Sequence, residues 1–299
     1  AGESQVIGSR VFPKPSSQPP STVYWNALAV WGILRPRLDG RTISRAHAHR
    51  LLKSVSLATD DDGQPLLGFD LPFVPLPNRP AGWRDGSITL RLAAAEATFL
   101  RDRLAQLRGS GGYELSLLAR LVRTEAASPP GMWADETRAI AGPDRAPLVR
   151  AHQAANLAGV GRAIYDALLE HIVEAYDKRE TSTRHRDHLA STVAEYGAVA
   201  AKLDVDALEA DIGVLPSKLR AVVAATKEWI ASKLTDPRPL FEVYEAAEAR
   251  KGPRARLPLT PNGRARRLEW ANDEHGLAGP LHYRWEQVST LLNDLAEAE

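Results

Sequence analysis

A run of cationic side chains between residues 41 and 53 has the residue types and the spacing to contact phosphate groups. The run comprises Arg41, Arg45, His49, Arg50 and Lys53. Residues 1 to 55 as a whole hold eight Lys or Arg residues and two acidic ones. Guanidinium groups bind phosphates and base edges through paired hydrogen bonds, and clustered basic residues are typical of nucleic-acid-binding surfaces. The segment therefore predicts contact with DNA, and a plain solvated helix face is the alternative.

A second basic segment spans residues 250 to 267, RKGPRARLPLTPNGRARR, with seven basic residues and no acidic one. The residues expected to meet an anion are Arg254, Arg256, Arg264, Arg266 and Arg267. Three prolines and two glycines indicate a loop, and a basic loop can follow a phosphate backbone. The whole chain has a net charge of +1, so both segments belong to a chain whose remainder is acidic. This asymmetry suggests one surface for anions, with solvated surface charge as the alternative for each segment.

The sequence gives weaker indications of acid–base catalysis or metal binding than of anion binding. Glu170 and His171 lie on one expected helix, and His185 and His188 stand three residues apart, a spacing that could hold a metal ion on a helix. No third ligand is evident, and the Glu-x-x-His motif is not met. We therefore predict no metal site and no cofactor. A hydrolase or nuclease site assembled around these four residues stays open, because sites built from distant residues leave no local motif.

Other local motifs of catalysis and nucleotide binding are not present. The acidic stretch TDDDG, residues 59 to 63, lacks the alternating ligands and the closing glutamate of a calcium loop. The glycine-rich stretch RGSGGYE, residues 108 to 114, lacks the Lys-Ser/Thr of a phosphate-binding loop. The chain has no cysteine and no Gly-x-Ser-x-Gly, which excludes a thiol nucleophile and leaves no sign of a nucleophilic serine.

Composition predicts a soluble protein. The chain of 299 residues is 44% hydrophobic and 25% charged, which is ordinary for a globular protein of two or three domains. No apolar run approaches twenty residues, no signal-peptide pattern is visible, and the lack of cysteine fits a reducing compartment. We expect a cytoplasmic protein with no membrane partner and no identifiable small-molecule substrate.

The elements that must position the first basic run are two helices. The stretch PPSTVYWNALAVWGIL, residues 19 to 34, predicts a helix from Ser21 to about Trp31 that stops at Gly32. Its residues Tyr24, Leu28 and Trp31 share one face, which favours packing in a core over a binding platform. A second helix is expected from Thr42 or Ser44 to Val55. Its apolar face would hold Ala48, Leu51, Leu52 and Val55, and the basic run would occupy the remaining arc.

This order of two helices, the second with a basic face, is typical of a helix-turn-helix or winged-helix domain. The connection of about ten residues, longer than the usual turn, requires a winged or degenerate form.

The remainder of the chain predicts a mainly α fold with few short strands. Short strands are expected near 66–69 and 87–92, and helices near 93–108, 114–124, 146–177, 186–203, 217–234 and 237–250. The longest helix repeats apolar residues from Leu157 to Tyr176 with a period of 3.6, and its small residues Ala155, Gly159 and Gly161 would let a neighbouring helix approach. The Pro- and Gly-rich stretch 56–86 marks a boundary. We predict an N-terminal helical domain at 1–86, a helical body at 87–250, and a basic loop with a C-terminal helical segment at 251–299.

Several stretches together resemble an uncharacterised bacterial family, the domain-of-unknown-function family numbered 6361. They are PPSTVYWNALAVWGIL, LRLAAAEATFLRDRL, SLLARL, NLAGVGRAIYDALLEH and HYRWEQVSTLLND, and the likeness runs from about residue 5 to the end. Members of that family carry a further N-terminal portion, so the resemblance implies a fragment or a split member. It also implies a setting in prokaryotic DNA modification or phage defence, and it supplies no catalytic residues.

Three functions follow as hypotheses. The leading one is a non-catalytic component that contacts DNA through the two basic segments. The second is a helical scaffold for a protein partner, with an exposed apolar patch around Trp270, Tyr283 and Trp285. The third is the hydrolase or nuclease described above, which would require a pocket with convergent carboxylates and histidines.

Overall fold

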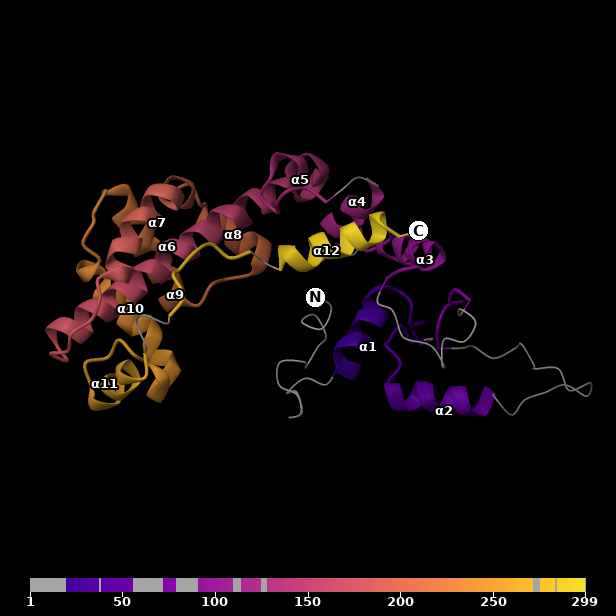
Figure 1. Ribbon diagram of the computed structural model, residues 1–299, viewed down its shortest axis with the longest axis horizontal. Helices are drawn as coiled ribbons and strands as arrows, with labels where there is room; N and C mark the ends of the chain where they lie inside the picture. Colours follow the sequence, from indigo (N-terminus) through magenta and orange to yellow (C-terminus); the bar gives the residue numbers. More distant parts are fainter. Residues whose placement is uncertain are drawn as a thin grey trace, which may run out of the picture. The chain divides into compact units, whose positions relative to one another are not determined.

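The structure is a computed structural model that describes residues 20–37, 39–55, 72–78, 91–109, 114–124, 128–270, 275–282 and 284–298 (Figure 1). Several predictions lie outside the described residues. They concern the segment 1–19, the strand near 66–69, most of the strand near 87–92, the acidic stretch 59–63, the glycines at 111 and 112, and Tyr283.

The predicted mainly α fold is confirmed. The described residues form twelve α-helices and a few 3-10 turns, and their β structure consists of three isolated bridges, such as Leu34 with Phe73. None of these helices combines the length and apolar composition that crossing a bilayer requires. Contacts divide the chain into unit 1, residues 1–128 with 287–299, and unit 2, residues 129–286. The sequence placed its boundaries at 86 and 250 instead, where the composition changes.

Unit 1 holds five of these helices. They are α1 (Pro20–Val30), α2 (Arg45–Val55), α3 (Ala94–Leu104), α4 (Leu117–Arg123) and, from Gln287 onward, α12 (Trp285–Ala296). Ile43, Leu34 and Ala48 form a small buried cluster on which Trp25 packs. The indole N–H of Trp25 donates a hydrogen bond to the Ile43 carbonyl over 2.8 Å, which ties α1 to the residues that precede α2.

The face of α1 differs in part from the prediction. Leu28 packs against the buried cluster as expected, but Tyr24 is 53% exposed, and Trp25 takes the place on the core side. Ser21 lies within the first turn, because the helix begins at Pro20. Gly32 ends the helical segment as predicted, with a φ of +65° that an L side chain rarely adopts.

Unit 2 is a bundle built around one long helix. Its helices are α5 (Asp135–Ile140), α6 (Arg145–Ala175), α7 (Arg184–Ala200), α8 (Val205–Ile212), α9 (Ser217–Ala231), α10 (Phe241–Glu248) and α11 (Pro261–Leu268). Three 3-10 turns, η3 (Gly142–Asp144), η4 (Arg238–Leu240) and η5 (Ala249–Arg254), connect some of them. α6 and α7 form a helical hairpin, and α9 and α10 pack beside it (Figure 1).

The sequence predicted α6 closely. Its apolar positions from Leu157 to Ile172 are buried, although Tyr176 is exposed just beyond the helix end. Gly159 does admit a close neighbour, but that neighbour is the extended backbone at Pro280, where a Cβ would lie 2.9 Å from the nitrogen. Gly161 faces the Tyr244 hydroxyl of α10, as expected for helix approach.

The predicted basic loop at 250–267 is wrong for its second half, because residues 261–268 form α11. Pro261 occupies the first turn, where a missing N–H costs nothing, and the Thr260 hydroxyl accepts a hydrogen bond from the Gly263 N–H over 3.2 Å. Proline and glycine usually interrupt a helix, but here Pro261 and Gly263 lie in the first turn of α11. The short helices α5 and α8 were not predicted, and the predicted helix 237–250 is divided into η4, α10 and part of η5.

Candidate functional site

The face of α2 that points away from the buried cluster is basic, as the sequence predicted. Ala48 is 1% exposed on the inner side, and Leu51 packs there as well. The predicted ligands on this helix and before it, namely Arg41, Arg45, His49, Arg50 and Lys53, are all exposed. We call the exposed side chains of Arg45, His49, Arg50 and Lys53 the α2 basic face. Leu52, expected on the apolar side, is 42% exposed at its edge.

The segment 20–55, which carries the α2 basic face, contains one acidic residue. Between residues 20 and 55 the acidic residue is Asp39, which lies 3.7 Å from the guanidinium of Arg37 and accepts the backbone N–H of Arg41 over 3.0 Å. Arg45 donates a hydrogen bond to the neutral hydroxyl of Ser21 on α1. The contacts of Asp39 are therefore made with residues that precede α2.

The second basic segment is largely engaged in internal contacts. Arg267 is fully buried, and its guanidinium binds both carboxylate oxygens of Asp177 over 2.8 and 2.9 Å. It also donates to the carbonyl of Pro258 over 2.9 Å. These hydrogen bonds hold the pKa of Asp177 below its usual range. The prediction that Arg267 contacts an anion outside the protein is wrong, because the side chain is not accessible.

The other predicted ligands of this segment vary in exposure. Arg266 donates to Glu269 over 2.8 Å and to the Pro253 carbonyl over 3.1 Å. Arg256 is half-buried, whereas Arg254 and Arg264 are exposed. The segment belongs to unit 2 and α2 belongs to unit 1, so each is considered separately.

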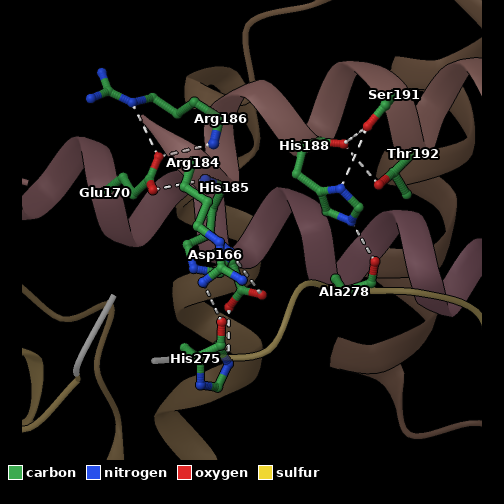
Figure 2. A network of polar contacts seen from close by, with 10 residues as sticks. All are labelled: Asp166, Glu170, Arg184, His185, Arg186, His188, Ser191, Thr192, His275 and Ala278. Atoms are coloured by element: carbon green, nitrogen blue, oxygen red, sulfur yellow. Dashed lines mark hydrogen bonds and ion pairs between the residues drawn. The ribbon is translucent and has the colours of Figure 1, made fainter. Parts of the chain in front are cut away.

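Three residues of the predicted hydrolase site, Glu170, His185 and His188, make polar contacts within unit 2 (Figure 2). Glu170 is fully buried in α6, and its two carboxylate oxygens accept the backbone N–H groups of His185 and Arg186 over 2.8 and 2.9 Å. It therefore caps the start of α7. His188 lies 2.6 Å from the Ala278 carbonyl, so its Nε2 carries the proton. His171 is half-buried, and burial lowers its pKa.

A carboxylate that the sequence did not single out lies next to this network. Asp166 of α6 is 5% exposed, and its two oxygens lie 4.0 Å from His185 Nδ1 and 3.8 Å from His275 Nε2 (Figure 2). The Trp270 ring packs against both histidines, with ring centroids 5.3 and 6.1 Å apart. Burial raises the pKa of Asp166, and the two imidazoles oppose that shift. The signal for this residue was its place on the buried stripe of α6, four residues before Glu170.

Asp166 and His275 are among the residues that line a groove of about 660 Å³ in unit 2. The groove is bordered by α6, α8, α9 and α10, and its sides are mainly Leu, Val and Ala. Within the described ranges, no group of three or more His, Cys, Asp or Glu residues could hold a metal ion. The expected apolar patch for a protein partner is not carried by Trp270, which is 5% exposed, and Trp285 is half-buried.

The chain was compared with protein-family models, with curated proteins and with solved structures, and none of them matches. The resemblance to the domain-of-unknown-function family 6361 stays a prediction, and the function must be argued from the geometry of the chain itself.

Proposed function

We propose that the chain contacts nucleic acid through the α2 basic face, as a non-catalytic component. The observation that carries the proposal is an exposed arc of cationic side chains on a helix without a single acidic residue. Arg45, His49 and Lys53 follow one another at intervals of four residues, so they form a line along the helix. From the rise per residue this line is about 12 Å long, which is close to the width of the major groove of DNA.

The arrangement costs the free protein some stability. Arg50 and Lys53 are like charges three residues apart on α2, and such a pair is unfavourable by about 0.2–0.5 kcal/mol. A polyanion would relieve that repulsion and release its own counterions on binding, which supports a phosphate ligand.

The anchoring of α1 against the residues before α2 supports the proposal further. Trp25 fixes α1 through its hydrogen bond to Ile43, so that α2 has a rigid support. A helix presented in this way is used in helix-turn-helix and winged-helix domains. The connection between the two helices runs from residue 31 to 44, so we propose a winged or degenerate form. A role in a prokaryotic DNA-linked or phage-defence system rests on the resemblance alone and forms part of the proposal.

The test is fluorescence anisotropy with labelled duplex and single-stranded DNA, from about 50 to 200 mM salt, where phosphate contacts have a steep salt dependence. A triple variant, Arg45→Gln with Arg50→Gln and Lys53→Gln, should bind more weakly. It should also lower the slope of log K against log [salt] by about 0.9 for each contact with duplex DNA that is lost.

The matched control removes the same charge from unit 2, at three exposed lysines outside the second basic segment, in Lys202→Gln with Lys218→Gln and Lys233→Gln. This control should bind DNA as the parent chain does. Absence of binding at about 50 mM salt, or equal loss in both triple variants, would refute the α2 basic face as the contact surface.

A further inference from the structure

The groove of unit 2 has the size and lining of a small-molecule site. Its volume of about 660 Å³ falls within the range of about 300–1,000 Å³ that such sites occupy. Ala154, Ala158 and Gly161 of α6 contribute small side chains, and Gly161 has no room for a larger one because a Cβ would lie 3.3 Å from the Tyr244 hydroxyl. Leu208 and Val222, from α8 and α9, are among the aliphatic residues that face them. The shape and chemistry suit an aliphatic body.

Exposed aliphatic side chains lie close in sequence to residues that line the groove. In the connection between α8 and α9, Val214 is 86% exposed, and Leu219 at the start of α9 is 45% exposed while it also lines the groove. Ile212 at the end of α8 is 64% exposed. Leu219, an exposed aliphatic side chain that lines the groove, favours an apolar occupant.

The lining of the groove contains a buried carboxylate, Asp166, that accepts no hydrogen bond from the residues that the structure describes. The Asp166 side chain is 6% exposed, yet among the described residues its nearest partners are the two imidazoles at 3.8 and 4.0 Å, beyond hydrogen-bond distance. A carboxylate in this state is costly unless a donor reaches it. A donor on the occupant of the groove would satisfy it.

Two cations, Arg162 and Lys251, also line the groove. Arg162 is exposed, and its Nη1 donates to the Gly279 carbonyl over 3.3 Å, which leaves other guanidinium donors for a ligand. The Lys251 side chain is 54% exposed and lies 3.1 Å from Glu248. A ligand whose head group is only a carboxylate would be repelled by the Asp166 carboxylate. A ligand whose head group is only an ammonium would be repelled by Arg162 and Lys251. A zwitterionic head group can place its ammonium at Asp166 and its carboxylate at Arg162, and so it avoids both repulsions.

We propose that this groove binds an amphipathic small molecule with an aliphatic body and a zwitterionic amino-carboxylate head. The ammonium would donate to Asp166, the carboxylate would accept from Arg162, and the aliphatic body would lie against the Leu and Val side chains. The site is separate from the α2 basic face, so the two proposals succeed or fail independently.

The test is isothermal titration calorimetry of the full chain with three probes that share a ten-carbon chain: 2-aminodecanoate, decylamine and decanoate. The first should bind at least about tenfold more tightly than the other two, the ratio that corresponds to one charge-assisted hydrogen bond. Decylamine or decanoate binding as tightly as 2-aminodecanoate would overturn the zwitterionic head. If none of the three binds at about 1 mM, the site itself is refuted.

Two variants locate the binding. Asp166→Asn should weaken 2-aminodecanoate by about tenfold and leave decanoate unchanged or tighter, while Glu242→Gln, an equal charge change at an exposed position of α10, should change nothing. The neutral amide suits a position where burial already disfavours the charge, so this variant should fold.

Ala158→Leu should weaken all three probes because it fills the groove, and Ala224→Leu, on the exposed side of α9, is its control. If Asp166→Asn or Ala158→Leu binds as the parent does, the ligand is not in this groove and the proposal is wrong.

Discussion

Two buried charged residues of unit 2, Glu248 and Arg267, are each held by several hydrogen bonds. Glu248, 5% exposed, accepts the Tyr165 hydroxyl with one carboxylate oxygen and the backbone N–H groups of Arg256 and Leu257 with the other. Arg267 is matched by Asp177 and by carbonyl oxygens. Burying charge is unfavourable unless each donor and acceptor is paired. Such residues therefore fix the positions of α6, α10 and α11 with high specificity.

Removal of Arg267 should be the most damaging change at this scale. Arg267→Ala leaves the buried Asp177 carboxylate without its guanidinium, and we expect the free energy of unfolding to fall by about 3–5 kcal/mol. Arg264→Ala removes a guanidinium that is 58% exposed and 4.0 Å from the same carboxylate, and it should cost about 1 kcal/mol or less. Urea unfolding of both variants measures the difference, and equal losses would contradict the importance of burial.

The same pair predicts a pH dependence. Because Arg267 lowers the pKa of Asp177 in the folded chain, this carboxyl stabilises the fold above its unfolded pKa of about 3.9, and that contribution is lost as pH falls towards the lower folded value. The stability of the parent should therefore drop more steeply below about pH 4 than that of Asp177→Asn. Urea unfolding at a series of pH values tests this, and parallel curves for the two proteins would exclude it.

At the scale of elements, the start of α7 depends on a side chain from another helix. Helix N-termini leave backbone N–H groups without partners, and Glu170 of α6 accepts two of them. Glu170→Ala should cost about 2 kcal/mol or more, since it removes a cap and leaves buried donors. It should also speed amide exchange in the first turn of α7.

Glu174→Ala is the matched control for this change. Glu174 also bonds Arg186, over 2.7 Å, but its side chain is 55% exposed, so its loss should cost about 1 kcal/mol or less. A Glu170→Ala variant as stable as this control would show that the capping hydrogen bonds contribute little.

Helices were predictable from the sequence where apolar periodicity or a helix-start residue defines them. The long apolar repeat predicted α6, and Ser217 after Pro216 correctly predicted the start of α9. The α2 basic face was also readable, because exposure follows helical periodicity once one side is apolar. Helix α11 was misread as a loop because proline and glycine have opposite meanings at a helix start and in a helix interior, and the sequence alone did not show where the start lay.

The pairing of Asp166 with His275 in the groove could not be predicted from local sequence patterns. Asp166 and His275 are 109 positions apart, and only the packing of the 275–280 segment beside α6 joins them. The burial of Arg267 could not be predicted for the same reason, because its partner Asp177 lies 90 positions away in the sequence. In both cases the sequence shows a charged residue but not the partner residue, and the partner determines whether the charged side chain is buried or exposed to solvent.

At the scale of the whole molecule, the chain consists of two units with separate cores. Leu34, Ile43 and Ala48 belong to a cluster of unit 1, whereas the large cluster around Ile164 and Leu168 lies entirely within unit 2. The sequence set its boundaries by composition at 86 and 250. Contacts instead assign residues 91–128 to unit 1 and residues 251–286 to unit 2. In unit 2, Arg267 of α11 binds Asp177, which lies just after the end of α6.

This division predicts that residues 129–284 fold without the remainder of the chain. That range contains the complete large cluster and all the buried pairs described above, and it ends before α12. It should unfold in urea in one cooperative transition with coincident fluorescence and circular dichroism curves. It should also bind the ten-carbon probes as the full chain does and show no steep, salt-dependent binding to DNA, because it lacks α2. A broad, non-cooperative transition would contradict the independence of unit 2. DNA binding as strong as that of the full chain would instead move the nucleic-acid surface to Arg254 and Arg264, the exposed part of the second basic segment.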